Sequence, residues 1–153
     1  MAKPSILFLC TGNSCRSQMA EGWGRTLHGD QFQFYSAGTT CHGLNPRAVA
    51  VMLEVGIDLT THTSKTTEDL PQKAMDYVFT VCSDAHQKCP LFPGSQVIHV
   101  GFDDPPRLTQ GLTDEEEILN VYRRVRDEIK EWILHLEHDL KLNSESNVEF
   151  KSK

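Results

Sequence analysis

The stretch SILFLCTGNSCRSQ, residues 5–18, joins an apolar run to a polar turn and then to a helical pattern. Residues 5–10 are largely apolar and end at Cys10, which is typical of a parallel strand covered on both faces. Apolar side chains then recur at helical spacing, at Met19, Ala20, Trp23 and Leu27. The stretch therefore predicts a strand, a turn at 11–16 and a helix that begins at about Ser17.

Three further runs, at 32–37, 76–82 and 96–100, have the composition of strands. A second helix is expected after the second strand, because Pro46 suits a first helical position and Gly56 suits a helix end. The alternation of strands and helices predicts an α/β fold, a single-domain, doubly wound sheet of four parallel strands flanked by helices on both faces.

The last helix is expected to begin with a capping box formed by Thr113 and Glu116, where the acidic residues 114–117 also favour a helix N-terminus. One apolar stripe follows, at Ile118, Val121, Tyr122, Val125, Ile129, Trp132, Ile133 and Leu136. This stripe predicts a helix that packs on the sheet, with the charges of RRVRDEIKE forming its solvated face.

Length and composition indicate one catalytic domain, 1–140, followed by a flexible polar tail, 141–153. The 153 residues are 39% hydrophobic and carry a formal net charge of -6. A negative chain lacks the basic face that nucleic acid or an anionic membrane requires. No stretch approaches the roughly 20 apolar residues of a membrane span, and the apolar start is too short for a secretory signal. We therefore expect a cytoplasmic protein.

Five cysteines are present, an odd number that does not suggest a disulfide framework. In a cytoplasmic chain they are expected to be reduced, catalytic or metal-binding. Two of them end predicted strands, Cys10 the first and Cys82 the third. Cys15 and Cys41 are expected to be structural or incidental, although Cys15 could form an unproductive bond with Cys10 on oxidation.

The turn after Cys10 has the composition of an oxyanion site. A turn that leads into a helix can direct several backbone N–H groups at one anion, and Arg16 adds a planar fork of donors. The same field favours a thiolate, so the pKa of Cys10 is expected to fall from about 8.5 to roughly 3.5–7.5, with Ser17 donating a hydrogen bond to the sulfur. The predicted oxyanion-binding residues are Thr11, Gly12, Asn13, Ser14, Cys15, Arg16 and Ser17. The alternative is a buried structural cysteine in a polar turn.

Five motifs resemble those of a known family. They are CTGNSCRSQMAEGWG (10–24), YSAGTTCHGLNPRAV (35–49), VCSDAHQKCP (81–90), GFDDP (101–105) and YRRVRDEIK (122–130), within a likeness that covers most of residues 4–138. They resemble the low-molecular-weight protein tyrosine phosphatase fold family and, within it, the thioredoxin-coupled arsenate reductases. Gln18 is typical of these reductases, because the phosphatases typically carry proline at that position.

The resemblance implies a relay of three cysteines that needs no cofactor. Cys10 attacks arsenate, and Asp104, rather than its neighbour Asp103, protonates the hydroxide that leaves. Cys82 then attacks Cys10 and releases arsenite. Cys89 attacks Cys82, and thioredoxin, or alternatively glutaredoxin, reduces the disulfide that results.

The spacing of the second and third cysteines limits this relay. If residues 82–89 were helical, Cys82 and Cys89 would lie ~10 Å apart, beyond the roughly 7 Å between Cα atoms that a disulfide can bridge. The segment is therefore expected to unwind and to carry the disulfide outward. A zinc site at Cys82, His86 and Cys89 is an alternative, although a fourth ligand is not evident.

Two other classes of function remain open. A phosphatase acting on phosphotyrosine or small phosphate esters would use the same Cys10 and Asp104, but Pro106 and Arg107 stand where the phosphatases usually carry tyrosines. A non-catalytic oxyanion sensor would not need the pairing of Cys10 with Arg16 and Asp104. The substrate that the resemblance implies is arsenate.

A further expectation concerns a cation. Some members of the family bind potassium beside the loop at positions that match Asn13, Glu21, Ser36 and an aspartate, and this chain has Lys65 in place of the aspartate. The lysine ammonium is expected to take the place of the cation beside Glu21. We therefore expect no bound metal and no dependence on potassium.

Overall fold

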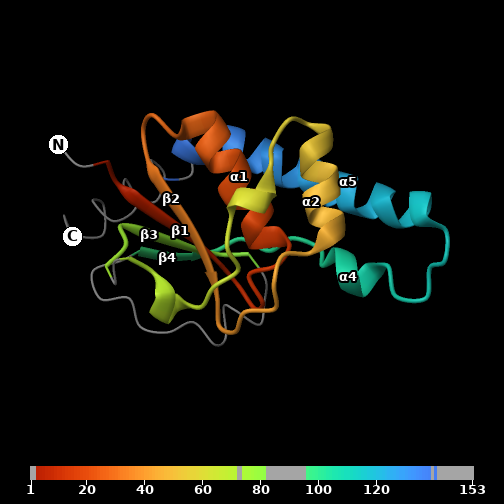
Figure 1. The fold of residues 1–153 in the computed structure, drawn as a ribbon. Helices are drawn as coiled ribbons and strands as arrows, with labels where there is room; N and C mark the ends of the chain where they lie inside the picture. Colours follow the sequence, from red (N-terminus) through yellow and green to blue (C-terminus); the bar gives the residue numbers. More distant parts are fainter. Residues whose placement is uncertain (1–2, 72–73, 82–95, 139, 141–153) are drawn as a thin grey trace.

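The computed structural model describes residues 3–71, 74–81, 96–138 and 140, which form one sheet with helices packed against it (Figure 1). The strands β1 (Ser5–Cys10), β2 (Gln33–Gly38), β3 (Tyr77–Thr80) and β4 (Gln96–His99) are parallel, in the order β2-β1-β3-β4. The helices are α1 (Arg16–His28), α2 (Pro46–Glu54), α4 (Pro105–Leu108) and α5 (Glu115–Leu134), with 3-10 helices η1 (Leu59–Thr61) and η2 (Thr67–Asp69). The predicted α/β architecture of four parallel strands flanked by helices is confirmed. The predicted tail, 141–153, lies outside the described residues.

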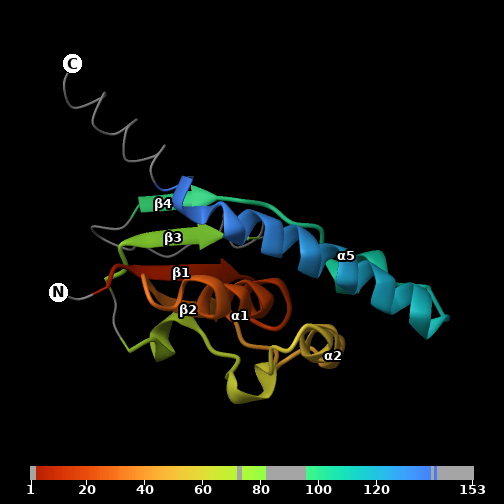
Figure 2. The ribbon, with the colours of Figure 1, turned by 90° about the horizontal axis from the view of Figure 1, so that it is seen from above.

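β1 pairs with β2 on one side and with β3 on the other. The chain therefore crosses the sheet in one direction to form β2 and in the opposite direction to form β3. Cys10 pairs with Gly38 of β2, and Leu9 pairs with Thr80 of β3. The chain passes from β1 to β2 through α1, which lies over both strands (Figure 2). The carboxyl end of β1 is therefore the switch point of a doubly wound sheet, where such folds bind ligands.

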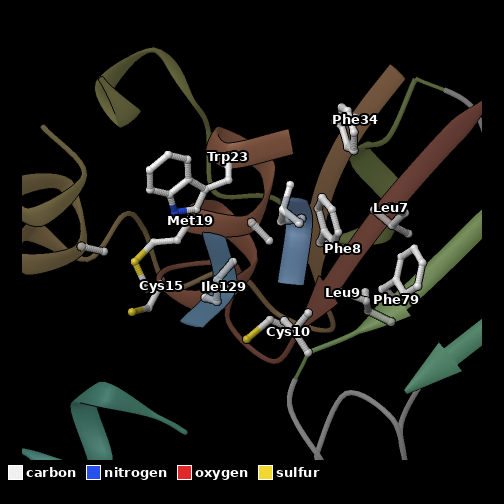
Figure 3. Packing of buried hydrophobic residues seen from close by; sticks show 14 of the residues in the cluster. Leu7, Phe8, Leu9, Cys10, Cys15, Met19, Trp23, Phe34, Phe79 and Ile129 are labelled. Carbon is white, nitrogen blue, oxygen red and sulfur yellow. The ribbon is translucent and has the colours of Figure 1, made fainter. Parts of the chain in front are cut away.

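Both faces of β1 are covered, since all six of its residues are buried. The ring of Phe8 stacks on Phe34 and Phe79, with centroids 5.8 and 6.1 Å away, and Trp132 of α5 meets Phe79 edge-on at 5.0 Å. The same buried cluster continues to the end of the strand, at Met19, Trp23, Cys10 and Cys15 (Figure 3). Because burying one such aromatic side chain contributes about 1.5–3 kcal/mol, this cluster fixes β1, α1 and α5 relative to one another.

The ends of α2 follow the predicted chemistry. Pro46 is the first helical residue, and Gly56 follows the helix with φ +84, a conformation that favours glycine. The N-cap is Asn45, whose Oδ1 accepts from the backbone N–H groups of Arg47 and Ala48. The capping residue was not predicted, although an asparagine directly before a proline is a common signal for it.

Two expectations for α5 are wrong. Its N-cap is Asp114, whose side chain accepts from Glu116 N–H, so the capping box of Thr113 and Glu116 does not form. Arg126 is 8% exposed rather than solvated, and its Nη1 donates to Val51 O at 2.8 Å. An arginine can be buried when its charge and donors find partners, and Arg126 also pairs with Glu54 and Asp127. Among the described residues, no helix has the length and apolar character of a membrane span.

Candidate active site

One cavity at the carboxyl end of β1 brings together three residues predicted to be catalytic. Cys10, Arg16 and Asp104 line this space of about 490 Å³. The other described residues of its lining are Thr11, Gly12, Ser14, Cys15, His42, Asn45, Pro106 and Arg107. A larger hollow of about 760 Å³ lies at the other end of the strands, near Lys3 and Arg25, and none of the described residues that line it is a cysteine or a histidine. The smaller cavity is therefore the candidate site.

The turn from β1 to α1 is folded around the side chain of Asn13. This residue is fully buried and has φ +49, in the left-handed region that asparagine tolerates better than most residues. Its Nδ2 donates to Ser17 Oγ at 2.9 Å, and its Oδ1 accepts from Lys65 N–H at 2.8 Å and from Gln18 Nε2 at 3.0 Å. Asn13 and Ser17, both predicted to bind the oxyanion, thus lie beneath the turn, while Thr11, Gly12, Ser14, Cys15 and Arg16 line the cavity.

Helix α1 begins at Arg16, one residue before the predicted start. Its N-cap residue is Cys15, whose side chain makes no capping hydrogen bond to the described residues. The first backbone N–H groups of the helix are therefore left for another acceptor, and an anion is the partner that the helix dipole favours.

The guanidinium of Arg16 also has donors to spare. Nη1 donates to Phe102 O at 3.1 Å, and Nη2 lies 3.6 Å from Asp104 Oδ1. Nε is buried and has no acceptor among the described residues. An oxyanion that accepted from Nε and Nη2 would satisfy a donor that is costly to leave unpaired. The residues present thus fit a bound tetrahedral oxyanion.

The two aspartates of the GFDDP motif differ in position. Asp104 lines the cavity and directly precedes α4, with its side chain 37% exposed. Asp103 does not line this cavity, and its Oδ2 pairs with Arg124 Nη2 at 3.1 Å. Of the two carboxyl groups, Asp104 is therefore the one placed to exchange a proton with a molecule bound above Cys10.

Cys15 is a second buried cysteine in the lining of the cavity. Burial raises the pKa of the Cys15 thiol to about 12, an effect that the nearby Arg16 only partly opposes. This thiol is neutral near pH 7 and is a poor nucleophile. Cys41 is exposed and is not part of the cavity lining. Cys82 and Cys89 lie outside the described residues, as does His86 of the alternative zinc site. In the part of the chain that is described, no three histidine, cysteine or acidic side chains cluster as metal ligands.

A buried charge cluster lies next to the turn, centred on Glu21. Its carboxylate accepts from the hydroxyl of Ser36 and pairs with Arg25 Nη2 at 2.8 Å. Lys65 Nζ lies 4.0 Å from Glu21 Oε1, so an ammonium stands beside this carboxylate. Burial lowers the pKa of Lys65, and the charge of Glu21 opposes that shift. This is the arrangement expected if Lys65 replaces a bound cation.

Gln18 links the turn to the segment before η2. Its Nε2 donates to Asn13 and to Thr63 O, so its Oε1 is the acceptor that faces His62 Nδ1 at 2.9 Å. Nδ1 of His62 therefore carries a hydrogen. Burial lowers the pKa of His62, more than the charge of Glu21 raises it. This link keeps the turn in place from below.

Four cavity residues were not among the predicted site residues: His42, Asn45, Pro106 and Arg107. A Cβ on Gly12 would lie 2.4 Å from His42 Nδ1, so the imidazole requires glycine at this position of the turn. Asn45 N–H donates to Ser14 O at 2.9 Å, which ties the start of α2 to the turn. The signal for His42 and Asn45 was their place after β2, because the ends of neighbouring parallel strands share one edge.

A cysteine at the end of a central parallel strand, beneath an amide-lined turn that fits an oxyanion, defines the class: an α/β protein with an oxyanion-binding thiol site. The family model described as low molecular weight phosphotyrosine protein phosphatase matches residues 5–146. The chain belongs to this family.

Several relatives of this chain are named arsenate reductases. The arsenate reductase of Halalkalibacterium halodurans is 54% identical over 131 residues, which cover 84% of this chain and 91% of that protein. A solved structure described as an arsenate reductase in the phosphate binding state is 32% identical, with a TM-score of 0.68 over 87% of this chain and 95% of that one. The thioredoxin-dependent arsenate reductase of Corynebacterium glutamicum is 25% identical, with a TM-score of 0.64 over 93% of this chain and 64% of its own.

Proposed function

We propose that this protein is an arsenate reductase that works through a three-cysteine relay. The observation that carries the proposal is the identity of about half of its residues with arsenate reductases, over five sixths of the chain. The cavity that joins Cys10, Arg16 and Asp104 supports it, because it offers a thiol, an anion clamp and an acid to one bound oxyanion. A relative of this fold is described in a phosphate-binding state, and phosphate has the shape and charge of arsenate.

The first step is an attack on arsenic. The oxyanion binds to the N–H groups of the turn and to Arg16, which place its arsenic above the Cys10 sulfur. The thiolate of Cys10 forms a sulfur–arsenic bond, and a hydroxide leaves as water after it takes a proton from Asp104. No electron has yet moved to arsenic, so this adduct is still arsenic(V).

The second step reduces the arsenic. The Cys82 thiolate attacks the Cys10 sulfur, a disulfide forms, and the electron pair of the sulfur–arsenic bond stays on arsenic, which leaves as arsenite. Backbone pairing supports the reach of this attack. Val81 N–H donates to Leu9 O at 2.9 Å. Val81, the residue directly before Cys82, therefore lies beside the end of β1, where Cys10 is.

The third step restores the first thiol. Cys89 attacks Cys82, the Cys10 thiolate leaves, and a disulfide between Cys82 and Cys89 remains. An external dithiol then reduces that disulfide. We propose thioredoxin as this partner, because a relative with the same fold is named thioredoxin-dependent.

The test compares donors and follows the disulfide. Purified protein is supplied with arsenate and with thioredoxin, thioredoxin reductase and NADPH, or with glutathione and glutaredoxin, and arsenite is measured. We expect turnover with thioredoxin. Mass spectrometry after one turnover without donor should find Cys82 bonded to Cys89. The absence of that bond, with arsenite formed, would contradict the relay.

A second function, phosphatase activity, is favoured by one observation: the family model is that of a phosphatase, and the same Cys10 and Asp104 serve both reactions. Cys82→Ser separates the two. A reductase loses arsenate turnover and keeps any hydrolysis of a small aryl phosphate, whereas a phosphatase loses neither.

A further inference from the structure

A second arginine, Arg107, stands at the mouth of the cavity. It is an exposed residue of α4 and lines the Cys10 cavity on the side of Asp104. It also lines a neighbouring cavity of about 450 Å³, and the two spaces share Arg16, Asp104 and Arg107. Arg107 therefore lines both of these spaces.

The charge of Arg107 is not offset by a carboxylate in the described parts of the chain. Each of the other arginines has a described carboxylate oxygen within 4.0 Å; they are Arg16, Arg25, Arg47, Arg123, Arg124 and Arg126. For Arg107, no such oxygen is found among the described residues. In a chain of net charge -6, an unpaired arginine beside an oxyanion site is positioned to act on that anion.

The charges of the site leave the bound anion without a full counter-charge. The thiolate of Cys10 offsets the charge of Arg16, whose Nη2 also lies 3.6 Å from Asp104. With Asp104 protonated, as the proposed first step requires, these side chains sum to zero, whereas the oxyanion is negative. Arg107 supplies the additional positive charge.

The backbone holds Arg107 on the same side as the acid. Asp104 is the N-cap residue of α4 and Arg107 is the third residue of that helix, and both line the Cys10 cavity. Leu108 N–H donates to Asp104 O at 2.9 Å, and Thr109 Oγ1 donates to Pro105 O at 2.8 Å. Pro105 and Pro106 restrict this turn further. The backbone of Arg107 is thus held in place close to Asp104.

We propose that Arg107 is a specificity-determining residue, which attracts the oxyanion and binds the oxygens that Arg16 and the turn leave uncovered. The role rests on the proposed function for its substrate, but the binding step itself requires only a tetrahedral oxyanion. Arg107 interacts with the anion before and during the attack on arsenic. Its loss therefore weakens binding and raises KM while kcat changes little.

The experiment uses inorganic phosphate as a probe that cannot be reduced. Isothermal titration calorimetry on the reduced full-length protein measures the Kd of phosphate for wild type, Arg107→Ala and Arg107→Lys. The matched control is Lys3→Ala, which also removes one exposed positive charge but lies at the opposite end of β1, where Lys3 Nζ donates to Gly29 O. Steady-state arsenate reduction gives kcat and KM for the same proteins.

We expect Arg107→Ala to weaken phosphate binding by about tenfold and to raise the KM for arsenate by a similar factor, because one charge-assisted contact is lost. Arg107→Lys keeps the charge without the fork and should lose only about threefold. Lys3→Ala should stay within about twofold, and the effect of Arg107→Ala should shrink as salt rises above about 0.15 M.

Two results would overturn the role of Arg107. One is phosphate binding by Arg107→Ala that matches the Lys3→Ala control. The other is a fall in kcat at unchanged KM, which would place the residue in the chemical step instead. If no variant, including wild type, reduces arsenate while Arg107→Ala still weakens phosphate binding, the proposed function fails and the role of Arg107 stands.

Discussion

The turn below the oxyanion cavity and the segment above it are held in different ways. The turn is buried, and the side chains of Asn13 and Gln18 tie it to the backbone at Thr63 and Lys65 through several hydrogen bonds. The segment 103–109 carries mostly exposed or half-exposed side chains and contains a helix of only four residues, α4. In the proposed reaction, the turn is therefore the rigid base that fixes the anion, and the upper segment is the source of charge and of a proton. Changes below should lower stability and activity together, whereas changes above should lower stability much less.

The largest expected effect comes from the upper segment. Asp104→Asn removes the acid for the departing hydroxide, and we expect kcat for arsenate reduction to fall roughly 100- to 1,000-fold. The free energy of unfolding should change little, because Asp104 is 37% exposed and its contact with Arg16 is long, at 3.6 Å. Initial rates of arsenite formation and urea unfolding measure the two quantities.

The matched control for this change is Asp103→Asn. Asp103 pairs with Arg124 outside the cavity, so its removal should leave kcat within about threefold of wild type. Equal losses in the two variants would show that the motif needs its charge in general rather than an acid at Asp104.

The next largest effect is expected in the turn below the cavity. Asn13→Ala removes three side-chain hydrogen bonds and places an alanine at φ +49. We expect a loss of about 2–4 kcal/mol in the free energy of unfolding, together with weaker phosphate binding. Urea unfolding and calorimetry with phosphate measure the two.

Thr109→Val is the counterpart in the upper segment, since it also removes a buried hydrogen bond, from Thr109 Oγ1 to Pro105 O. It should cost only about 1 kcal/mol. The proposed contrast is wrong if this substitution destabilises the protein as much as Asn13→Ala does.

Periodicity and turn chemistry predicted the strands to within two residues at each end and placed the starts of α1 and α2 to within one. They did so because both patterns depend on neighbours in the chain. The sequence also selected Cys10, Arg16 and Asp104, which the fold collects into one cavity. The burial of Arg126 was missed, because its partners Val51 and Glu54 are more than 70 residues away.

The cavity lining shows the same limit. His42 and Asn45 reach the site through backbone hydrogen bonds between the segment after β2 and the turn, at Gly12 O and Ser14 O. Such contacts depend on the tertiary register rather than on a local pattern. Asn13 and Ser17 were predicted to bind the oxyanion, and that remains a prediction for their backbone N–H groups. Their side chains hydrogen-bond to each other beneath the turn, a direction that the motif alone does not specify.

A smaller effect is expected in the pH dependence of stability, through His62, which lies beneath the turn next to Gln18. Burial lowers the pKa of His62, so between the folded value and about 6.5 the unfolded chain binds more protons than the folded one. Stability should therefore fall as the pH drops below about 6.5 and level off below the folded pKa. His62→Gln keeps a donor for Gln18 without a titrating group and should reduce this slope. The charged groups around His62 are Glu21, Arg25, Asp58 and Lys65, and they are unchanged in the variant. Urea midpoints between pH 7.5 and 5 measure the slope, and an equal slope in both proteins would assign it to other groups.

The smallest expected effect is that of potassium. Arg25 and Lys65 already place two positive charges near the Glu21 carboxylate, at 2.8 and 4.0 Å, so a monovalent cation gains little there and meets repulsion. Arsenate reduction should be equal in potassium and in sodium at the same ionic strength, whereas a severalfold rise in potassium alone would contradict this assignment. Lys65→Asp removes the ammonium and adds a carboxylate beside Glu21, two like charges that a cation would relieve. That variant should therefore become more active and more stable in potassium than in sodium, which would trace the cation independence of the wild type to a single side chain below the turn.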